Sequence, residues 1–117
     1  MAQEPITVTQ AVARRLRVLR DGLGLTHGQL AARAATRGAP QITAYLISAI
    51  ERGGGTGRRV VGLDEVVALA HVLDVSPMDL IDAGAPIRAT DTLTVEATSV
   101  RRWFCGEQSP RRGRKSA

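Results

Sequence analysis

The stretch of sequence that decides the fold covers residues 23–53 and reads LGLTHGQLAARAATRGAPQITAYLISAIERG. Within it, Thr26 is followed three residues later by Gln29, which is the spacing of a capping box at a helix start. Leucines on either side of this pair stand at the positions of a hydrophobic staple, which fixes the direction in which the chain enters the helix. The pattern predicts a helix over about residues 27–36.

The end of the same stretch predicts a second helix. Thr43 is its candidate cap, and the isoleucines around Thr43 form another staple. Gly53 follows the pattern, and glycine commonly ends a helix because it adopts a left-handed conformation without strain. We therefore expect a helix over residues 44–52, preceded by a long turn that contains Gly and Pro, and followed by a flexible loop over residues 53–57.

Three more helices are predicted outside this stretch. The first has an apolar stripe at helical spacing from about residue 11, with arginines over most of its other faces, and it ends at the glycines of residues 22–24. A later helix begins near Leu63, where two acidic residues suit a helix N-terminus. The last begins after Ser76, which is a candidate cap followed directly by proline.

These five helices are expected to form one domain over residues 10–84. Residues 1–9 lack periodicity and predict a flexible N-terminal arm. Residues 85–108 predict a C-terminal extension, in which alternating residues 92–97 form a short strand that is followed by one or two helical turns. Residues 109–117 are basic and polar and predict a disordered tail. The fold class is thus all-α, with a short strand and helix at the end.

Composition argues against several classes of protein. One cysteine, Cys105, excludes an intrachain disulfide and fits a reducing, cytoplasmic location, and two distant histidines disfavour a zinc site. The longest uncharged run, residues 38–50, is too short to cross a bilayer, and residues 1–10 do not resemble a signal peptide. Paired carboxylates, a nucleophile beside a histidine and a phosphate-binding loop are all missing from the pattern. We therefore expect a protein that is not an enzyme and needs no cofactor or metal.

The charge is distributed unevenly along the chain. Residues 1–62 carry nine arginines against three acidic residues, a net charge of +6, whereas residues 63–98 carry one arginine against seven acidic residues, a net charge of −6. Residues 99–117 return to a net charge of +5. A strongly basic first half favours a polyanionic partner such as nucleic acid, although an ordinary solvated surface explains the composition equally well.

Four segments in order resemble the helix-turn-helix regulators of the phage-repressor, Cro and xenobiotic-response-element type. They are Leu23-Gly24-Leu25-Thr26, Gln29-Leu30-Ala31, Ile47-Ser48-Ala49-Ile50-Glu51-Arg52-Gly53, and the run Leu69–Leu80. The resemblance covers about residues 11–82 and implies a five-helix, lambda-repressor-like DNA-binding domain, here with a long turn. It also implies that helix 44–52 enters the major groove while the start of the preceding helix meets phosphate.

The resemblance further implies roles for individual residues. Thr43, Ala44, Tyr45, Ser48 and Ala49 are expected to face the groove, and His27, Gly28 and Gln29 to meet phosphate. Arg52, Arg58 and Arg59 are expected at the backbone or a groove edge. Arg20 and Glu51 match a structural ion pair that joins the first helix to the third. The implied function is a sequence-specific transcriptional regulator, a repressor in the first instance, that binds double-stranded DNA as a homodimer.

Other interpretations remain open on the sequence alone. The expected reading face is poor in Asn, Gln and Arg, so specificity is expected to be modest or to depend on the arginine loop, DNA shape or a partner. Tyr45 fits either the groove or the filling of the long turn, and Ser48 and His27 also fit solvated helix positions. The rings of Trp103 and Phe104 fit either a fold-back onto the domain or an interface. The alternative function is a protein-interaction module, such as an antitoxin, that uses the C-terminal extension.

Overall fold

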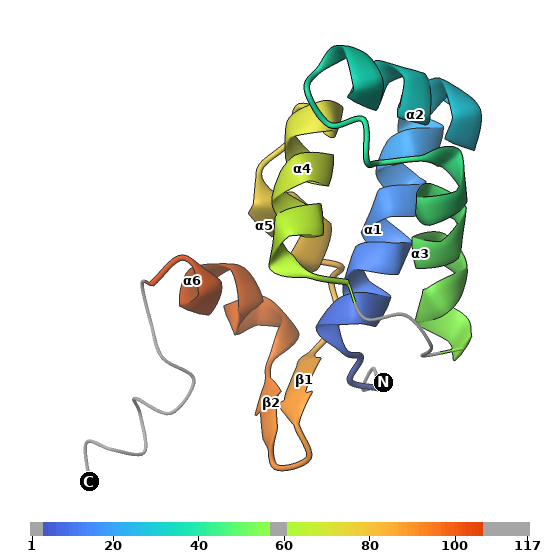
Figure 1. The fold of residues 1–117 in the computed structure, drawn as a ribbon. Coiled ribbons are helices and arrows are strands. Elements are labelled where there is room, and N and C mark those ends of the chain that lie inside the picture. Colours follow the sequence, from blue (N-terminus) through green and yellow to red (C-terminus); the bar gives the residue numbers. More distant parts are fainter. Residues whose placement is uncertain (1–3, 57–60, 107–117) are drawn as a thin grey trace, which may run out of the picture.

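The computed structural model describes residues 4–56 and 61–106. It is mostly helical, with one small antiparallel sheet toward the C-terminal end (Figure 1). In chain order the elements are α1 (Val8–Gly22), α2 (His27–Thr36), α3 (Ala44–Thr56), α4 (Leu63–Leu73), α5 (Pro77–Ile81), β1 (Ile87–Thr90), β2 (Leu93–Val95), the 3-10 helix η1 (Ala97–Ser99) and α6 (Val100–Phe104). The mostly helical class predicted from the sequence is confirmed. Within the described ranges, no helix combines the length and the apolar character that crossing a membrane requires.

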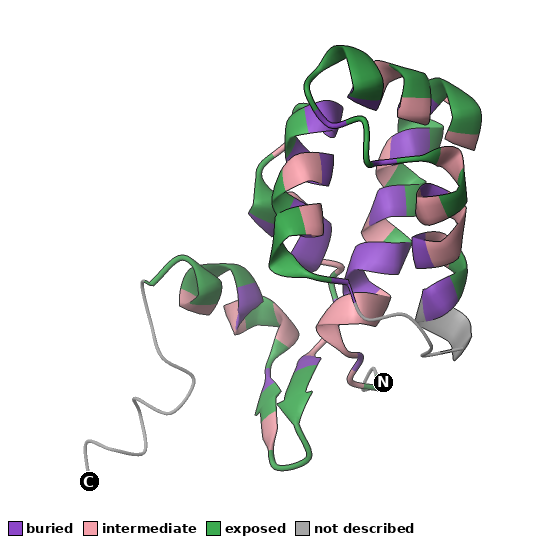
Figure 2. Cartoon of the chain, in the orientation of Figure 1, coloured by how far each residue is buried: buried purple, intermediate pink, exposed green. Residues whose placement is uncertain are grey.

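The core lies around α1. This helix packs against α3, α4 and α5, while α2 lies across one end of the bundle, against α3 and α4 (Figure 1). The buried positions, purple in Figure 2, are mainly Leu, Ile, Val and Ala. Leu16 on α1, Leu30 on α2 and Ile47 on α3 are all 0% exposed. Burial of such aliphatic side chains is the main force that holds the helices together.

The predicted caps are formed at the starts of α2 and α3. Thr26 Oγ1 accepts a hydrogen bond from the Gln29 amide at 3.1 Å, and Gln29 Oε1 accepts one from the Thr26 amide at 2.9 Å. Thr43 Oγ1 accepts a hydrogen bond from the amide of Leu46 at 3.1 Å. These bonds satisfy amides that have no partner within the first turn, so the sequence locates both starts correctly.

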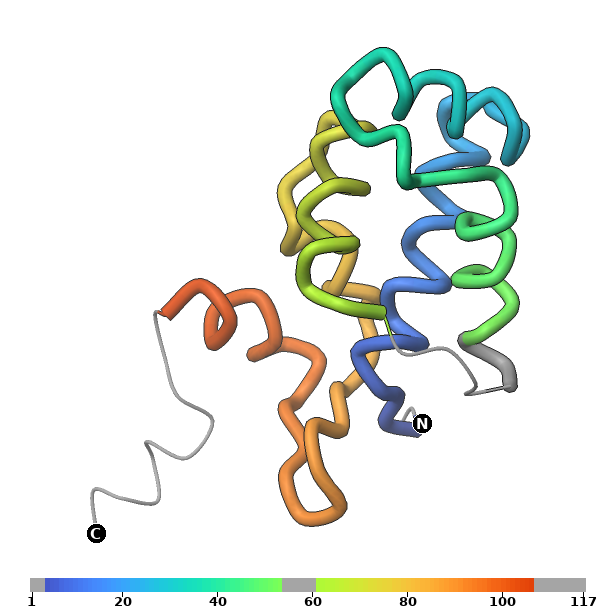
Figure 3. Tube along the Cα trace, viewed as in Figure 1, coloured from blue at the N-terminus to red at the C-terminus, as the bar shows by residue number. Residues whose placement is uncertain are grey.

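The long connection between α2 and α3 covers residues 37–43 and can be followed in Figure 3. Gly38 has a left-handed φ of +84°, and the amide of Ala39 donates to the carbonyl of Ala34 at 2.9 Å, which closes the end of α2. Ala39 and Ile42 are 4% and 1% exposed, respectively. The connection is therefore anchored by its own apolar side chains in the core.

The flexible arm predicted over residues 1–9 is wrong for the residues that the structure describes. Ile6 is 4% exposed and forms a parallel bridge with Ile87. Its amide donates to the Pro86 carbonyl at 2.9 Å, and its carbonyl accepts from the Arg88 amide at 2.8 Å. Burial of an isoleucine and two backbone bonds fix this segment to β1.

The first helix also starts earlier than predicted. Thr7 accepts a hydrogen bond from the Gln10 amide at 3.1 Å, and the Gln10 side chain accepts one from the Thr7 amide at 2.9 Å. This capping box starts α1 at Val8. The sequence contained the signal for this start, a threonine followed three residues later by glutamine. The predicted start was later because it was taken from the apolar stripe, which becomes regular only further along the chain.

The third helix is longer than the predicted range of 44–52. α3 continues to Thr56, so Gly53 does not end it, and the flexible loop predicted from that residue onward is wrong up to residue 56. Gly53 is buried, and glycine accepts the right-handed helical conformation at a cost of about 1 kcal/mol relative to alanine. Local preference for a turn is therefore overridden at this position. Residue 57 lies outside the described ranges.

The C-terminal extension contains a hairpin rather than a lone strand. β1 pairs with β2 in antiparallel register, with Ile87 opposite Val95, and both side chains are 0% exposed. The strand predicted over residues 92–97 is shorter, because β2 ends at Val95 and a 3-10 turn follows. β1 was not predicted from the sequence. The tail predicted over residues 109–117 lies outside the described ranges.

The last helix, α6, is attached to α5. The Arg101 guanidinium contacts Asp79 at 2.9 Å and Asp82 at 3.1 Å. Trp103 packs against the core, so the fold-back interpretation holds for this ring. Phe104 meets Trp103 edge to face, with ring centroids 5.1 Å apart, and it remains 41% exposed. Cys105, which follows Phe104, is exposed.

Candidate nucleic-acid interface

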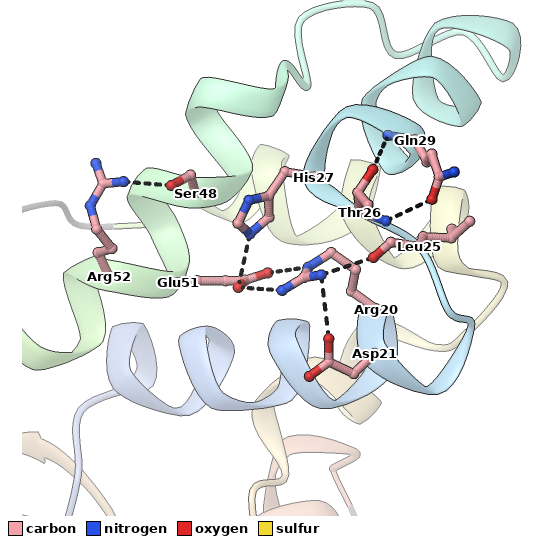
Figure 4. Close-up of polar contacts among 9 residues, drawn as sticks. All are labelled: Arg20, Asp21, Leu25, Thr26, His27, Gln29, Ser48, Glu51 and Arg52. Atoms are coloured by element: carbon pink, nitrogen blue, oxygen red, sulfur yellow. Dashed lines mark hydrogen bonds and ion pairs between the residues drawn. The ribbon is translucent and has the colours of Figure 1, made fainter.

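Three helices meet at one carboxylate. Glu51 on α3 accepts hydrogen bonds from Arg20 on α1, from Nε to Oε2 at 2.7 Å and from Nη2 to Oε1 at 2.9 Å. His27, the first residue of α2, places Nε2 3.1 Å from Glu51 Oε1 (Figure 4). The Arg20 guanidinium also donates from Nη1 to the Leu25 carbonyl at 2.8 Å, just before α2. We call Arg20, His27 and Glu51 the clasp, because they join α1, α2 and α3.

The clasp is shielded from solvent. The side chains of Arg20 and Glu51 are 11% and 7% exposed, whereas that of His27 is 37% exposed. Burial alone raises the pKa of Glu51, but the hydrogen bonds from Arg20 and His27 outweigh this effect, and the pKa lies below its ordinary value. The hydrogen bond to Glu51 in turn raises the pKa of Arg20. The carboxylate is therefore ionised at neutral pH, and the expected pair of Arg20 and Glu51 is present.

The clasp fixes which side of α3 faces outward. Ile47 and Ile50 are 0% exposed and point into the core, while Tyr45 is 78% exposed. Ser48 is partly buried, and its Oγ accepts a hydrogen bond from the exposed Arg52 one turn further along (Figure 4). Tyr45 therefore projects from the helix into solvent. The interpretation in which its ring fills the long turn is wrong.

The remaining expected groove residues are less prominent. Ala44 and Ala49 are half-buried, so each offers only part of its methyl group to a ligand. Thr43 is exposed, but its hydroxyl already caps α3. Arg58 and Arg59 lie outside the described residues. Among the expected groove residues, Tyr45 and Thr43 are thus exposed, and Arg52, which is expected at the backbone or a groove edge, is exposed as well.

The N-terminus of α2 is a second exposed feature. Gly28 and Gln29 are exposed, and a Cβ at Gly28 would meet no atom within 4 Å. The Gln29 amide is used by Thr26, whereas the amides of His27 and Gly28 make no backbone hydrogen bond to residues in the described ranges. A helix start with free amides attracts anions, because the amide dipoles point outward there.

Two surface features were not predicted. Leu63 and Val67 on α4 are 78% and 57% exposed and lie one turn apart, on the side away from the buried stripe of that helix. A shallow pocket of about 560 Å³ lies between the N-terminal segment, α1 and β1, and Arg14 and Arg88 are among its lining residues. The helical period could have revealed the first feature, but the second depends on the long-range contact of the N-terminal segment with β1.

The arrangement offers hydrogen-bond donors, positive charge and an outward aromatic ring. Among the described residues, no group of three or more His, Cys, Asp or Glu side chains is placed to hold a metal ion. Comparison of the chain with protein-family models, with curated proteins and with solved structures gives no match.

Proposed function

We propose that this protein is a sequence-specific DNA-binding transcriptional regulator, and specifically a repressor. In this proposal α1–α5 form a lambda-repressor-like helix-turn-helix domain with a long turn, α3 enters the major groove, and the start of α2 meets the phosphate backbone. The proposal extends the resemblance of the sequence to phage-repressor, Cro and xenobiotic-response-element regulators. It needs no cofactor, because groove recognition uses side chains and backbone amides alone.

One observation carries the proposal: the clasp joins the inner side of α3 to α1 and α2, while Tyr45 on the same helix is exposed to solvent. A recognition helix must present a fixed set of side chains, because base edges are read at hydrogen-bond distances. Arg20 and Glu51 supply this rigidity from the inner side of α3. The helix is thus supported from within and open outside, as groove entry requires.

Tyr45 is the leading candidate for sequence reading. Its 78% exposure leaves the ring and the hydroxyl free to meet a thymine methyl group and a base edge. Ser48, Ala49 and Ala44 contribute shorter contacts around it. Arg52 now bonds Ser48 and is free to swing to a phosphate, because both side chains lie at the surface of one helix.

Backbone contacts supply most of the affinity in this proposal. The free amides of His27 and Gly28 bind one phosphate, and the Gln29 side chain lies next to them. Arg58 and Arg59 add sequence-independent attraction. The net charge of +6 over residues 1–62, which include α1, α2 and α3, favours the approach of this half of the chain to DNA.

The decisive experiment measures affinity for genomic DNA fragments, selected by binding, as a function of salt. We expect log affinity to fall linearly with log salt, and a flat plot would overturn the proposal. Tyr45→Ala and Ser48→Ala should change the preference among sequences, whereas the double variant Arg58→Ala, Arg59→Ala should weaken all sequences alike. Val67→Ala on α4 is the matched surface control and should bind as the unmodified protein does.

The C-terminal extension supports a second candidate function, a protein-interaction module such as an antitoxin. Phe104 leaves 41% of its surface exposed beside Trp103, and exposed aromatic side chains often mark contacts between proteins. The same surface is our candidate for homodimer formation. Co-purification with a small protein partner through Phe104, with loss of the partner in Phe104→Ala, would favour this candidate, and it is compatible with DNA binding.

A further inference from the structure

His27 lies between a carboxylate and the expected position of a DNA phosphate. Its Nε2 atom is 3.1 Å from Glu51 Oε1. The pKa of Glu51 is lowered, so this carboxyl group is ionised at neutral pH and can only accept hydrogen bonds. Nε2 must therefore carry the hydrogen atom that it shares with Glu51. The neutral ring is thus the tautomer with hydrogen on Nε2.

The second ring nitrogen has a different environment. Nδ1 makes no hydrogen bond to any residue in the described part of the chain, and the side chain is 37% exposed. A neutral imidazole carries hydrogen on only one nitrogen, so with Nε2–H directed to Glu51 the neutral ring presents a lone pair at Nδ1. A phosphate oxygen is also an acceptor, and two acceptors repel each other. Only the protonated ring donates to Glu51 and to phosphate at once.

We infer that His27 contacts phosphate as an imidazolium bridging Glu51 and DNA, so that DNA binding takes up a proton at this residue. The inference rests on the proposed function. It adds that the complex with DNA holds one proton more than the separate protein and DNA. The proton comes from solvent and is bound at Nδ1, with no bond formed or broken to DNA. His27 is thus a phosphate-binding residue whose donor exists only in one protonation state.

The surrounding charges are compatible with this role. Glu51 from α3 faces the ring directly, and Arg20 from α1 lies behind it, itself 3.3 Å from Asp21. Arg52 on α3 is directed to Ser48 (Figure 4). A phosphate oxygen at Nδ1 would be a second acceptor beside Glu51, and only the protonated ring donates to both.

The test uses a fluorescently labelled, mixed-sequence DNA duplex at low salt, because the phosphate contact does not depend on sequence. Affinity is measured between about pH 8 and about pH 5 for the full chain and for His27→Gln. We expect about a tenfold gain in affinity on acidification for the unmodified protein and a flat profile for the variant, because glutamine donates without titrating. Calorimetry in buffers of different ionisation enthalpy should show uptake of about one proton per bound chain.

The chain provides a matched control in its other histidine, His71, which is exposed on α4. His71→Gln should keep the pH profile of the unmodified protein. Binding that is independent of pH, or a profile that His27→Gln leaves unchanged, would overturn the inference and leave the proposed function standing. Failure to bind DNA at any pH or salt would overturn both. Proton uptake by the unmodified protein tests the inference even if His27→Gln does not fold.

Discussion

The guanidinium of Arg20 on α1 and the carboxylate of Glu51 on α3 face each other in a two-point ion pair, with N–O distances of 2.7 and 2.9 Å. Both side chains are almost fully buried. In such a pair the loss of one partner leaves an uncompensated charge in the interior, so the pair fixes the geometry more than it adds net stability. This pair joins α3 to α1, as the proposed role of α3 in DNA recognition would need.

This pair gives the first prediction. Glu51→Gln should lower the free energy of unfolding by about 3 kcal/mol, because Arg20 would remain buried without its counter-ion. Urea denaturation followed by circular dichroism measures the change. The matched control is Glu96→Gln, an exposed carboxylate, for which the change should stay within about 0.5 kcal/mol. Equal effects of the two substitutions would show that the ion pair is dispensable.

The second prediction concerns acid. The pKa of Glu51 lies below its ordinary value of 4.5 for the reasons given above, and a hydrogen bond from Arg37 lowers the pKa of Asp74 below 3.8. The unfolded chain therefore binds protons first as the pH falls. Stability from these groups is fully present at neutral pH and is lost as the pH drops from the ordinary values through the lowered ones. Urea titrations from about pH 7 to about pH 3 should show this loss, and the loss should be smaller in Glu51→Gln. Constant or rising stability over that interval would contradict it.

A third prediction separates two glycines at the end of α1. Gly24 has a left-handed φ of +70°, and the amide of Leu25 donates to the Arg20 carbonyl at 3.2 Å to close the helix. Gly22 is helical, and a Cβ at either glycine would meet no atom within 4 Å. Gly24→Ala should destabilise the protein by about 1 kcal/mol through backbone strain alone, whereas Gly22→Ala should stabilise it by up to about 1 kcal/mol. Thermal unfolding of the two variants provides the test, and a shift of the same sign in both would refute it.

The fourth prediction concerns the attachment of α6. The Arg101 side chain is half exposed, and its ion pairs with Asp79 and Asp82 should together be worth about 1 kcal/mol. Arg101→Gln should therefore increase hydrogen exchange over residues 97–105 while leaving α1–α4 protected. Arg17→Gln, which removes the same charge from the exposed side of α1, should not change exchange in α6. Unchanged exchange in Arg101→Gln would show that Trp103 and Val100 suffice to hold the helix.

Much of the helical scaffold could be predicted because its signals are local. Thr26 and Ser76 each lie three residues from the side chain that completes their cap. A few neighbouring residues therefore specify where α2 and α5 start. The predictions were wrong where packing against the core overrode the local conformational preference of a residue. Gly53 is of a residue type that commonly ends a helix, yet α3 continues to Thr56. Four of the predicted groove residues lie on α3 and Thr43 directly precedes it. Their exposure, high for Tyr45 and intermediate for Ala44, could not be predicted without the packing of α3 against α1.

The sequence by itself determined where α2, α3, α4 and α5 begin, because capping bonds and apolar stripes join residues only three or four positions apart. Only the tertiary structure decided the contacts between distant segments: Ile6 beside Ile87, Arg101 on Asp79, and the His27 ring on Glu51. No local pattern encodes such pairs, since each forms only after the helices have packed and brought the two chain segments together. The role that we propose for His27 depends on that packing, because the ring contacts a carboxylate on another helix.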